Sequence, residues 1–302
     1  MGCICTAVGG RSSREKRINP EPSAETPTPG RNRRALALLA LAALIGAGGY
    51  GALWPLRLAA DWQLIGTIDL PQPDSLAVDA AGRLRYVTLQ TRPGRLVELT
   101  AAGPRTVFGK LGEPDGLLTG TDNLVVTEEE PSGRIMTYHP ATATLSVLAR
   151  MHSPEGLLRQ SDGSLVVSQD RPDGALWLLR EGAAPELLVD GLDQPEGLCR
   201  LPDGRIGIAE SGRGRILAWG PAGLQTLAED LDGIDQLACG ADGSLWAVIS
   251  QNRSGELVRI KDGRRQVLAR HLRQPQGIAL APDGSLYLAE TGADRVLHLA
   301  PR

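Results

Sequence analysis

Short apolar runs recur along the chain, and turns rich in Gly, Pro and Asp separate them. The stretch QPEGLCRLPDGRIGIAE (194–210) places two such runs on either side of an Asp-Gly pair. QPQGIALAPDGSLYLAE (274–290) repeats that pattern almost residue for residue. Short runs bounded by turn residues are typical of β-strands, and Asp-Gly is a strong hairpin signal. The pattern therefore predicts an all-β fold built from a repeated unit.

The unit occurs six times, and each copy begins with a Pro-x-Gly motif or a variant of it. The copies start at Pro73, Pro114, Pro154, Pro195, Ile234 and Pro275. Their separations are 41, 40, 41, 39 and 41 residues. A period of about forty residues is typical of the blades of a β-propeller.

Each copy reads as four strands. In the fourth copy we expect strands at 197–201, 205–209, 215–219 and 224–228. The last copy supplies only three such runs before the chain ends, and residues 62–68 supply a fourth just before the first copy. Pairing the two ends in one blade would close the ring and leave only short, protected edges. The sequence thus predicts a six-bladed β-propeller closed by an N-terminal outer strand.

The N-terminal part has a different composition. Residues 1–34 are polar and basic, with seven Lys/Arg against three Asp/Glu, and we expect them to be a disordered cytoplasmic tail. Residues 35–56 carry no charge and are long enough to cross a bilayer. We interpret them as a transmembrane signal anchor, with a cleaved signal peptide as the alternative. The positive-inside rule then puts the propeller (57–302) in the periplasm, the lumen or the extracellular space.

Charge, aromatic content and cysteine content indicate which partners and which cysteine chemistry to expect. A net charge of −3 and 3% aromatic residues give no reason to expect nucleic-acid binding, and we expect a monomer. The start MGCICT fits the myristoylation pattern. Cys199 and Cys239 are the two cysteines of the propeller. They are one register apart in neighbouring repeats, so we expect them to point to opposite faces as free, buried thiols.

The residue between Pro and Gly is the strongest candidate for chemistry. It occupies the same point of every blade, so the six copies must form a ring at the channel mouth. The ring residues are Asp74, Asp115, Glu155, Glu196, Asp235 and Gln276. Two carboxylates about 7 Å apart repel by roughly 2 kcal/mol at an effective dielectric near 20. A divalent cation with oxygen ligands, such as Ca²⁺, would offset this cost, and so would retained protons. Alternatively, each carboxylate caps the turn that enters its strand.

A second tier lies at the end of the second strand of each copy. Its members are Thr88, Glu128, Gln169, Glu210, Ile249 and Glu290, and we expect the glutamates to hydrogen-bond a neighbouring blade. We expect Glu129 and Glu130 to form a solvated rim.

His152 lies three residues before Glu155, where it is either a proton shuttle or an exposed loop residue. Asn252 begins a glycosylation sequon. No nucleophile, zinc-protease or phosphate-loop motif is present.

The phrase P-x-G-I-A-x-x-x-D-G-x-L-Y-x-A-E-T, followed by R-V-L-x-L, resembles SMP-30/gluconolactonase-like and strictosidine synthase-like propellers, and NHL-repeat proteins share much of it. The resemblance covers about residues 62–302. The predicted anchor before the propeller is similar to the layout of the adipocyte plasma membrane-associated protein branch. Virginiamycin-lyase-like propellers share the AET phrase but have seven blades.

The resemblance implies a set of site residues. In the gluconolactonase family, the residues before Gly in the first, fourth and fifth blades hold a divalent metal, which implies Asp74, Glu196 and Asp235 here. The third blade helps to hold substrate, which implies Glu155. We add Asp115, Gln276 and His152 as further substrate contacts, because they share the top face. The chain departs from the family by having Glu where two Asn are common. Gln276 stands where strictosidine synthases have a catalytic Glu.

Two functions fit these residues. The first is a metal-dependent hydrolase that acts on a small lactone or ester at the top of the channel. Its cation, which we expect to be Ca²⁺, would polarise the substrate carbonyl, and Asp235 would be the general base. The second is a non-catalytic, NHL-like binding scaffold tethered to the membrane, whose top face binds a protein or another ligand.

Overall fold

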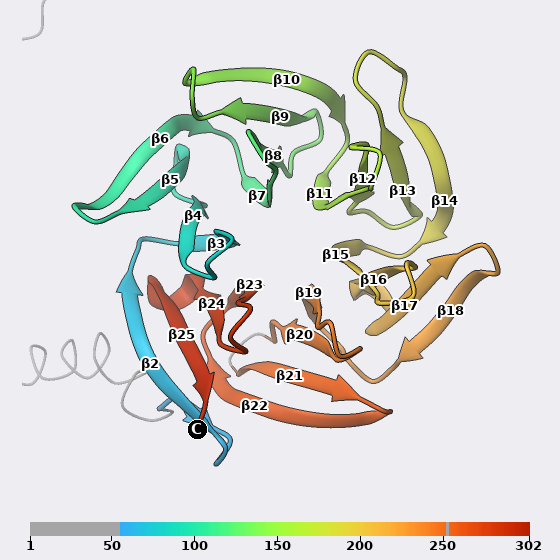
Figure 1. Cartoon of the computed structure of the whole chain (residues 1–302). Helices are drawn as coiled ribbons and strands as arrows, with labels where there is room; N and C mark the ends of the chain where they lie inside the picture. The colour runs from blue at the N-terminus through green and yellow to red at the C-terminus, as the bar shows by residue number, and fades with distance from the viewer. Residues whose placement is uncertain (1–54, 252–253) are drawn as a thin grey trace, which may run out of the picture. The chain divides into compact units, whose positions relative to one another are not determined.

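A computed structural model describes residues 55–251 and 254–302. These residues form six antiparallel sheets arranged around a central axis, which Figure 1 shows in a view along that axis. The six-bladed β-propeller predicted from the sequence is confirmed. The first strand of every blade lies innermost and the fourth lies at the rim (Figure 1).

The first three blades follow the repeat in chain order. Blade 1 contains β3 (Pro73–Val78), β4 (Leu84–Leu89), β5 (Gly94–Thr100) and β6 (Gly103–Leu111). Blade 2 contains β7 (Pro114–Thr119), β8 (Leu124–Glu128), β9 (Gly133–His139) and β10 (Thr144–Met151). Blade 3 contains β11 (Pro154–Arg159), β12 (Leu165–Gln169), β13 (Gly174–Leu179) and β14 (Glu186–Leu192).

The other three blades complete the ring. Blade 4 contains β15 (Pro195–Arg200), β16 (Ile206–Glu210), β17 (Arg215–Gly220) and β18 (Gly223–Ala228). Blade 5 contains β19 (Ile234–Cys239), β20 (Leu245–Ile249), β21 (Gly255–Lys261) and β22 (Arg264–Leu272), and the short β1 (Arg57–Leu58) pairs with its outer edge. Blade 6 contains β23 (Pro275–Leu280), β24 (Leu286–Glu290), β25 (Arg295–Pro301) and β2 (Trp62–Asp69).

The two ends of the described chain meet in blade 6, as predicted. Strand β2 pairs antiparallel with β25, from Trp62 opposite Pro301 to Asp69 opposite Arg295. This pairing covers the outer edge of β25 and joins the first propeller strand to the last. The ring is therefore closed by backbone hydrogen bonds between segments far apart in the sequence.

The hydrophobic core lies between the blades. Each of its six clusters combines apolar side chains from two neighbouring sheets; one, for example, joins Ile216 of blade 4 to Val258 of blade 5. Residues that alternate along a strand point to opposite faces of its sheet, so each blade packs against one neighbour on each side. The alternating apolar pattern in the sequence reflects this two-sided burial.

The Asp-Gly pairs form the predicted turns between the first and second strands. Gly204 has φ +87° and Gly284 has φ +86°, a left-handed conformation that favours glycine. The aspartate Oδ1 of Asp203 accepts the backbone N–H of Arg205 at 3.0 Å and so fixes the turn. The Pro-x-Gly motifs lie at one end of the blades, which we call the top face. The Asp-Gly turns lie at the opposite end.

Several expectations lie outside the described residues: the cytoplasmic tail 1–34 with its myristoylation pattern, most of the proposed transmembrane segment 35–56, and the sequon at Asn252. Within residues 55–251 and 254–302, the structure contains no helix with the length and apolarity needed to span a bilayer.

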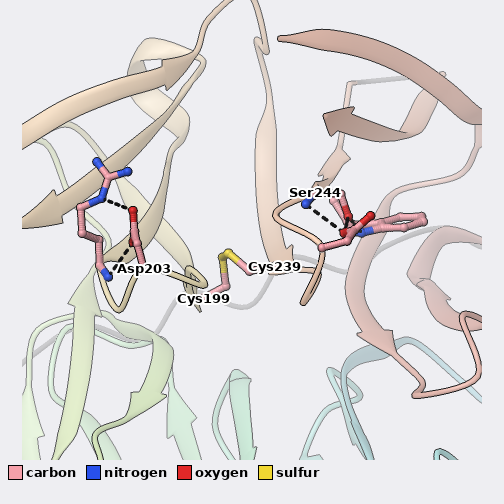
Figure 2. Close-up of a disulfide and its surroundings, with 7 residues drawn as sticks. Cys199, Asp203, Cys239 and Ser244 are labelled. Carbon is pink, nitrogen blue, oxygen red and sulfur yellow. Dashed lines mark hydrogen bonds and ion pairs between the residues drawn. A yellow bond between two sulfur atoms is a disulfide. The ribbon is translucent and has the colours of Figure 1, made fainter. Parts of the chain in front are cut away.

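The prediction of two free thiols is wrong. Cys199 of β15 and Cys239 of β19 form a disulfide, with Cα atoms 5.5 Å apart. Figure 2 shows the bond crossing from one sheet to the next, near the turns that contain Asp203 and Ser244. The two cysteines do lie on opposite faces of their own sheets. Neighbouring blades meet with opposite faces, however, so residues one register apart on adjacent blades point toward each other.

Candidate cation site at the channel mouth

The six predicted ring residues lie at the start of the six innermost strands, at the top of the channel. We call them the channel ring. In all six blades, the innermost strand shows a register shift directly after its first residue; in blade 4, for example, it lies between Pro195 and Leu198. The irregular ladder there frees the ring residue from regular pairing. Within the ring, Asp74, Asp115 and Glu155 are buried, and Glu196, Asp235 and Gln276 are half-buried.

The glycine of the Pro-x-Gly motif is explained by a close approach between neighbouring innermost strands. A Cβ atom on Gly116 would lie 2.1 Å from the backbone oxygen of Glu155 in the next blade. On Gly156 it would lie 2.3 Å from the backbone oxygen of Glu196. A side chain at these positions would push the ring residues apart, so glycine is required by packing.

Hydroxyl groups tie the ring backbones together in the first half of the propeller. The Thr88 hydroxyl donates to the Asp115 backbone oxygen at 3.3 Å, the Thr127 hydroxyl to that of Glu155 at 3.0 Å, and the Ser168 hydroxyl to that of Glu196 at 2.8 Å. Each of these bonds joins one blade to the next. Sequence reasoning missed this set, although a Thr or Ser just before the end of the second strand was visible in three copies.

Three ring carboxylates come together in blades 3, 4 and 5. One carboxylate oxygen from each of Glu155, Glu196 and Asp235 lies within 4.8 Å of the other two. We call these residues the acidic triad. Of the three expected metal ligands, Glu196 and Asp235 belong to it and Asp74 does not, whereas Glu155, expected to hold substrate, does. Gln236 Nε2, from blade 5, donates to Glu155 Oε1 of blade 3 at 3.2 Å.

The remaining ring residues surround the triad. Gln276 faces Asp235: with its amide nitrogen turned toward that residue, Nε2 donates to Asp235 Oδ1 at 2.9 Å. Asp115 Oδ2 is 3.5 Å from Gln90 Nε2. His152 lies in the loop that precedes Pro154, and its side chain is exposed.

A further set of polar residues follows the second strand of each blade on the top face. We call this set the collar. Its members are Gln90, Glu129, Asp170, Ser211, Ser250 and Thr291. The carboxyl groups of Glu129 and Asp170 interact with each other, which raises the pKa of Glu129 and partly offsets the rise in the pKa of Asp170. Glu129 is half-buried, and the expectation that it belongs to a solvated rim is wrong for this residue.

Every carboxyl group of the ring and the collar has a raised pKa. Burial is the largest cause for all seven, and repulsion between the carboxylates adds to it in six. For Glu129 the pKa rises to about 8. None of the twelve ring and collar residues is basic, so no cationic side chain within these two sets lowers the pKa values.

Several buried carboxylate oxygens at the mouth have no hydrogen-bond partner. They are Asp74 Oδ2, Asp115 Oδ1, Asp170 Oδ1 and Glu196 Oε2. Buried polar atoms are normally paired, because an unpaired one costs about 1–3 kcal/mol. The alternative that each acidic side chain only caps a turn does not account for these atoms. An all-oxygen donor set with unused lone pairs fits a hard divalent cation such as Ca²⁺.

The second-strand glutamates have a structural role, but it lies within their own blade, and the expectation that they hydrogen-bond a neighbouring blade is wrong. Glu128, Glu210 and Glu290 each accept a backbone N–H from the loop entering their own blade and pair with an arginine of the third strand. Thr88 does not belong to this tier. Strand β4 is one residue longer than its equivalents, so Leu89 is the residue opposite Pro73 and matches Glu128.

A channel of about 310 Å³ runs below the ring. Its wall consists mainly of apolar residues of the innermost strands, including Leu117, Leu157 and Leu198, and it also contains Cys199 and Cys239. The acidic groups are therefore confined to the top end of a passage whose lining also includes the polar residues Ser75, Arg200 and Gln236.

Comparison with known proteins supports the fold. No family model and no curated protein sequence matches the chain. A gluconolactonase structure from Xanthomonas campestris superposes with a TM-score of 0.64 at 17% identity, covering 82% of this chain and 95% of that one. The calcium-binding protein regucalcin from Agrobacterium tumefaciens gives 0.61 at 14% identity, with 79% and 94% covered. Virginiamycin B lyase from Staphylococcus aureus gives 0.58 at 12%, with 80% and 100% covered. At these identities the likeness shows the propeller architecture.

Proposed function

We propose that the top face binds a divalent cation, with Ca²⁺ as the best candidate, and hydrolyses a small lactone or ester there. The observation that carries the proposal is the acidic triad, whose carboxylate oxygens lie within 4.8 Å of one another and include the unpaired Glu196 Oε2. Three carboxylates at this spacing are costly unless a cation or protons offset their repulsion. The gluconolactonase and regucalcin structures with the same architecture support the proposal.

The chain's own residues would divide the work of hydrolysis. Glu155, Glu196 and Asp235 would hold the cation. A divalent cation bound there supplies Lewis-acid polarisation of the substrate carbonyl. Asp115 and Gln276 border the triad and would orient the substrate, with His152 at the rim. In the reaction, a water oxygen bonds to the carbonyl carbon, the bond from that carbon to the alkoxy oxygen breaks, and the water proton reaches the leaving oxygen through a carboxylate.

Two groups compete for the role of proton acceptor. Asp235 is the residue that the sequence put forward, and it belongs to the triad. The Glu129–Asp170 pair, which the sequence did not predict, is the second candidate for the proton acceptor. A carboxyl group with a pKa of about 8 exchanges its proton near neutral pH, where a general base is most effective. We assign the role to Glu129, since Asp235 is committed to holding the cation.

The location of the protein is part of the proposal. We infer that residues 35–56 anchor it and that the propeller lies outside the cytosol. The disulfide supports this placement, because disulfides persist in oxidising compartments. Labelling with a membrane-impermeant amine reagent in intact cells tests it: tryptic peptides of the propeller should be labelled, and an unlabelled propeller would place it in the cytosol.

A hydrolase assay tests the activity. Full-length protein with added calcium should hydrolyse members of a panel of small lactones and esters, and a chelator should abolish the activity. Glu196→Gln should abolish it as well, whereas Glu129→Gln should lower kcat without weakening calcium binding. Asp203→Asn, in an exposed turn at the opposite end of the same blade, is the matched control and should keep full activity. Protein that binds calcium yet hydrolyses nothing in the panel would contradict the hydrolase and favour the membrane-tethered binding scaffold.

A further inference from the structure

The interface between blades 4 and 5 lacks the hydroxyl bridge found at the three interfaces before it. Thr88, Thr127 and Ser168 each donate to the ring backbone of the following blade. The equivalent position in β16 is Ala209, which pairs with Ile216 as Ser168 pairs with Leu176. Because alanine has no hydroxyl group, the side chain at this position cannot donate a hydrogen bond to the Asp235 backbone oxygen.

The disulfide joins the innermost strands at this same interface. It links β15 to β19, two strands that pair only with the second strand of their own sheet. A bond between their cysteines is therefore a direct tie between two strands that no backbone hydrogen bond connects.

The neighbouring strand is adapted to the disulfide. Gly207 of β16 lies beside Cys199, and a Cβ atom there would be 2.9 Å from Cys199 Sγ and 3.4 Å from Cys239 Sγ. In the other five blades the equivalent position carries a larger residue, namely Tyr86, Val125, Val166, Trp246 and Tyr287. Glycine appears only where the disulfide needs the space.

The two tied strands carry two members of the acidic triad. Glu196 precedes Cys199 by three residues, and Asp235 precedes Cys239 by four. At about 3.3 Å per residue, the disulfide lies roughly 10–13 Å from the carboxylates along short, paired strands. The spacing of β15 and β19 at the disulfide therefore influences the spacing of Glu196 and Asp235 at the mouth.

We propose that Cys199 and Cys239 are positioning residues for the cation site, so that cation affinity depends on the redox state of their disulfide. The inference rests on the proposed cation site. A dithiol would reduce the bond: the S–S bond breaks, two thiols form, and the reductant leaves as its own disulfide after giving up two electrons and two protons. Both cysteines line the 310 Å³ channel, which gives a small dithiol a route to them.

Calcium titration of the full-length protein in its two redox states tests the inference. Cys3 and Cys5 are replaced by Ser throughout, so that Cys199 and Cys239 are the only thiol pair. Reduction by dithiothreitol should weaken calcium binding about tenfold, the lower end of the cost of losing an outer-shell partner. By linkage, calcium should make the disulfide harder to reduce by the same factor, which for two electrons is about 30 mV. Circular dichroism should show the fold retained in both states.

Three variants separate positioning from general loosening. Cys199→Ala/Cys239→Ala should bind calcium like the reduced protein, and adding Ala209→Ser, which restores the hydroxyl found in blades 1–3, should recover part of the affinity. Val97→Ala removes buried methyl groups from blade 1 and should lower the melting temperature without changing the calcium Kd.

The outcomes distinguish this inference from the proposed function. Oxidised protein that binds no calcium would overturn the cation site and this inference with it. Equal affinity in the oxidised and reduced states, with both thiols titrated as free after reduction, would overturn the inference alone. A loss of affinity in Val97→Ala equal to that on reduction would also overturn it, because the effect would then come from general destabilisation.

Discussion

Replacing Glu196 by Gln should raise the stability of the calcium-free protein and remove most of the stabilisation that calcium gives. The triad oxygens lie within 4.8 Å of one another, so each ionised pair repels by at least about 3.5 kcal/mol at an effective dielectric of 20. Glu196 takes part in two of the three pairs. With all three carboxylates ionised, its neutralisation would relieve about 7 kcal/mol or more, and it would relieve less where the triad already holds protons. In chelator, Glu196→Gln should therefore be more stable than the wild type, and the gain should grow as pH rises.

Calcium should narrow that difference, because it stabilises the wild type more than the variant. At about 100 times its Kd, calcium stabilises the wild type by about 2.7 kcal/mol, which for a domain of this size raises the melting temperature by about 5–10 °C. Glu196→Gln lacks a triad ligand and should gain little. Thermal unfolding followed by circular dichroism, with chelator and with calcium, gives all four values. A variant that melts below the wild type in chelator, or that gains as much from calcium, would refute the reasoning.

Three further predictions concern the same face. The pKa of Glu129 is about 8 in the folded protein against an ordinary 4.5, so its contribution to stability is present below pH 4.5 and lost as pH rises through about 8; urea unfolding in chelator should show stability falling over this range, and a flat profile would contradict it. Glu210→Ala leaves the half-buried Arg215 without its ion-pair partner and should lower the free energy of urea unfolding by about 3–5 kcal/mol. A loss below about 1 kcal/mol would show that this ion pair is dispensable for stability. Gly156→Ala places a Cβ 2.3 Å from the Glu196 backbone oxygen and should weaken both folding and calcium binding in calorimetry, whereas Gly109→Ala, with open space around it, should not; equal effects would count against the packing argument.

The repeat predicted the fold and the channel ring because both follow from geometry that the sequence period contains. Any residue at one fixed point of six blades must encircle the axis. The ring was therefore predictable down to its degenerate member, Asp235, in a copy that lacks both the Pro and the Gly of the motif. Closure was predictable for the same reason, since the last copy is one strand short and 62–68 supplies it.

The remaining features depend on how blades meet and how loops fold. Glu129 and Asp170 come together from the loops of different blades, and nothing in the local sequence of either predicts that contact. The disulfide was missed because faces were assigned within each sheet and not across the interface between sheets. Thr88 was placed in the wrong tier because β4 is one residue longer than its equivalents, a difference that the period of the repeat does not reveal.

The metal content of the full-length protein, purified without chelator and measured by elemental analysis, tests the cation site most directly. We expect about one calcium or similar divalent ion per chain in the wild type and in Asp203→Asn, and its loss in Glu196→Ala with the fold retained. A metal-free wild type that is correctly folded, and that remains metal-free after dialysis against calcium, would contradict it and leave the carboxylates of the ring balanced by protons alone.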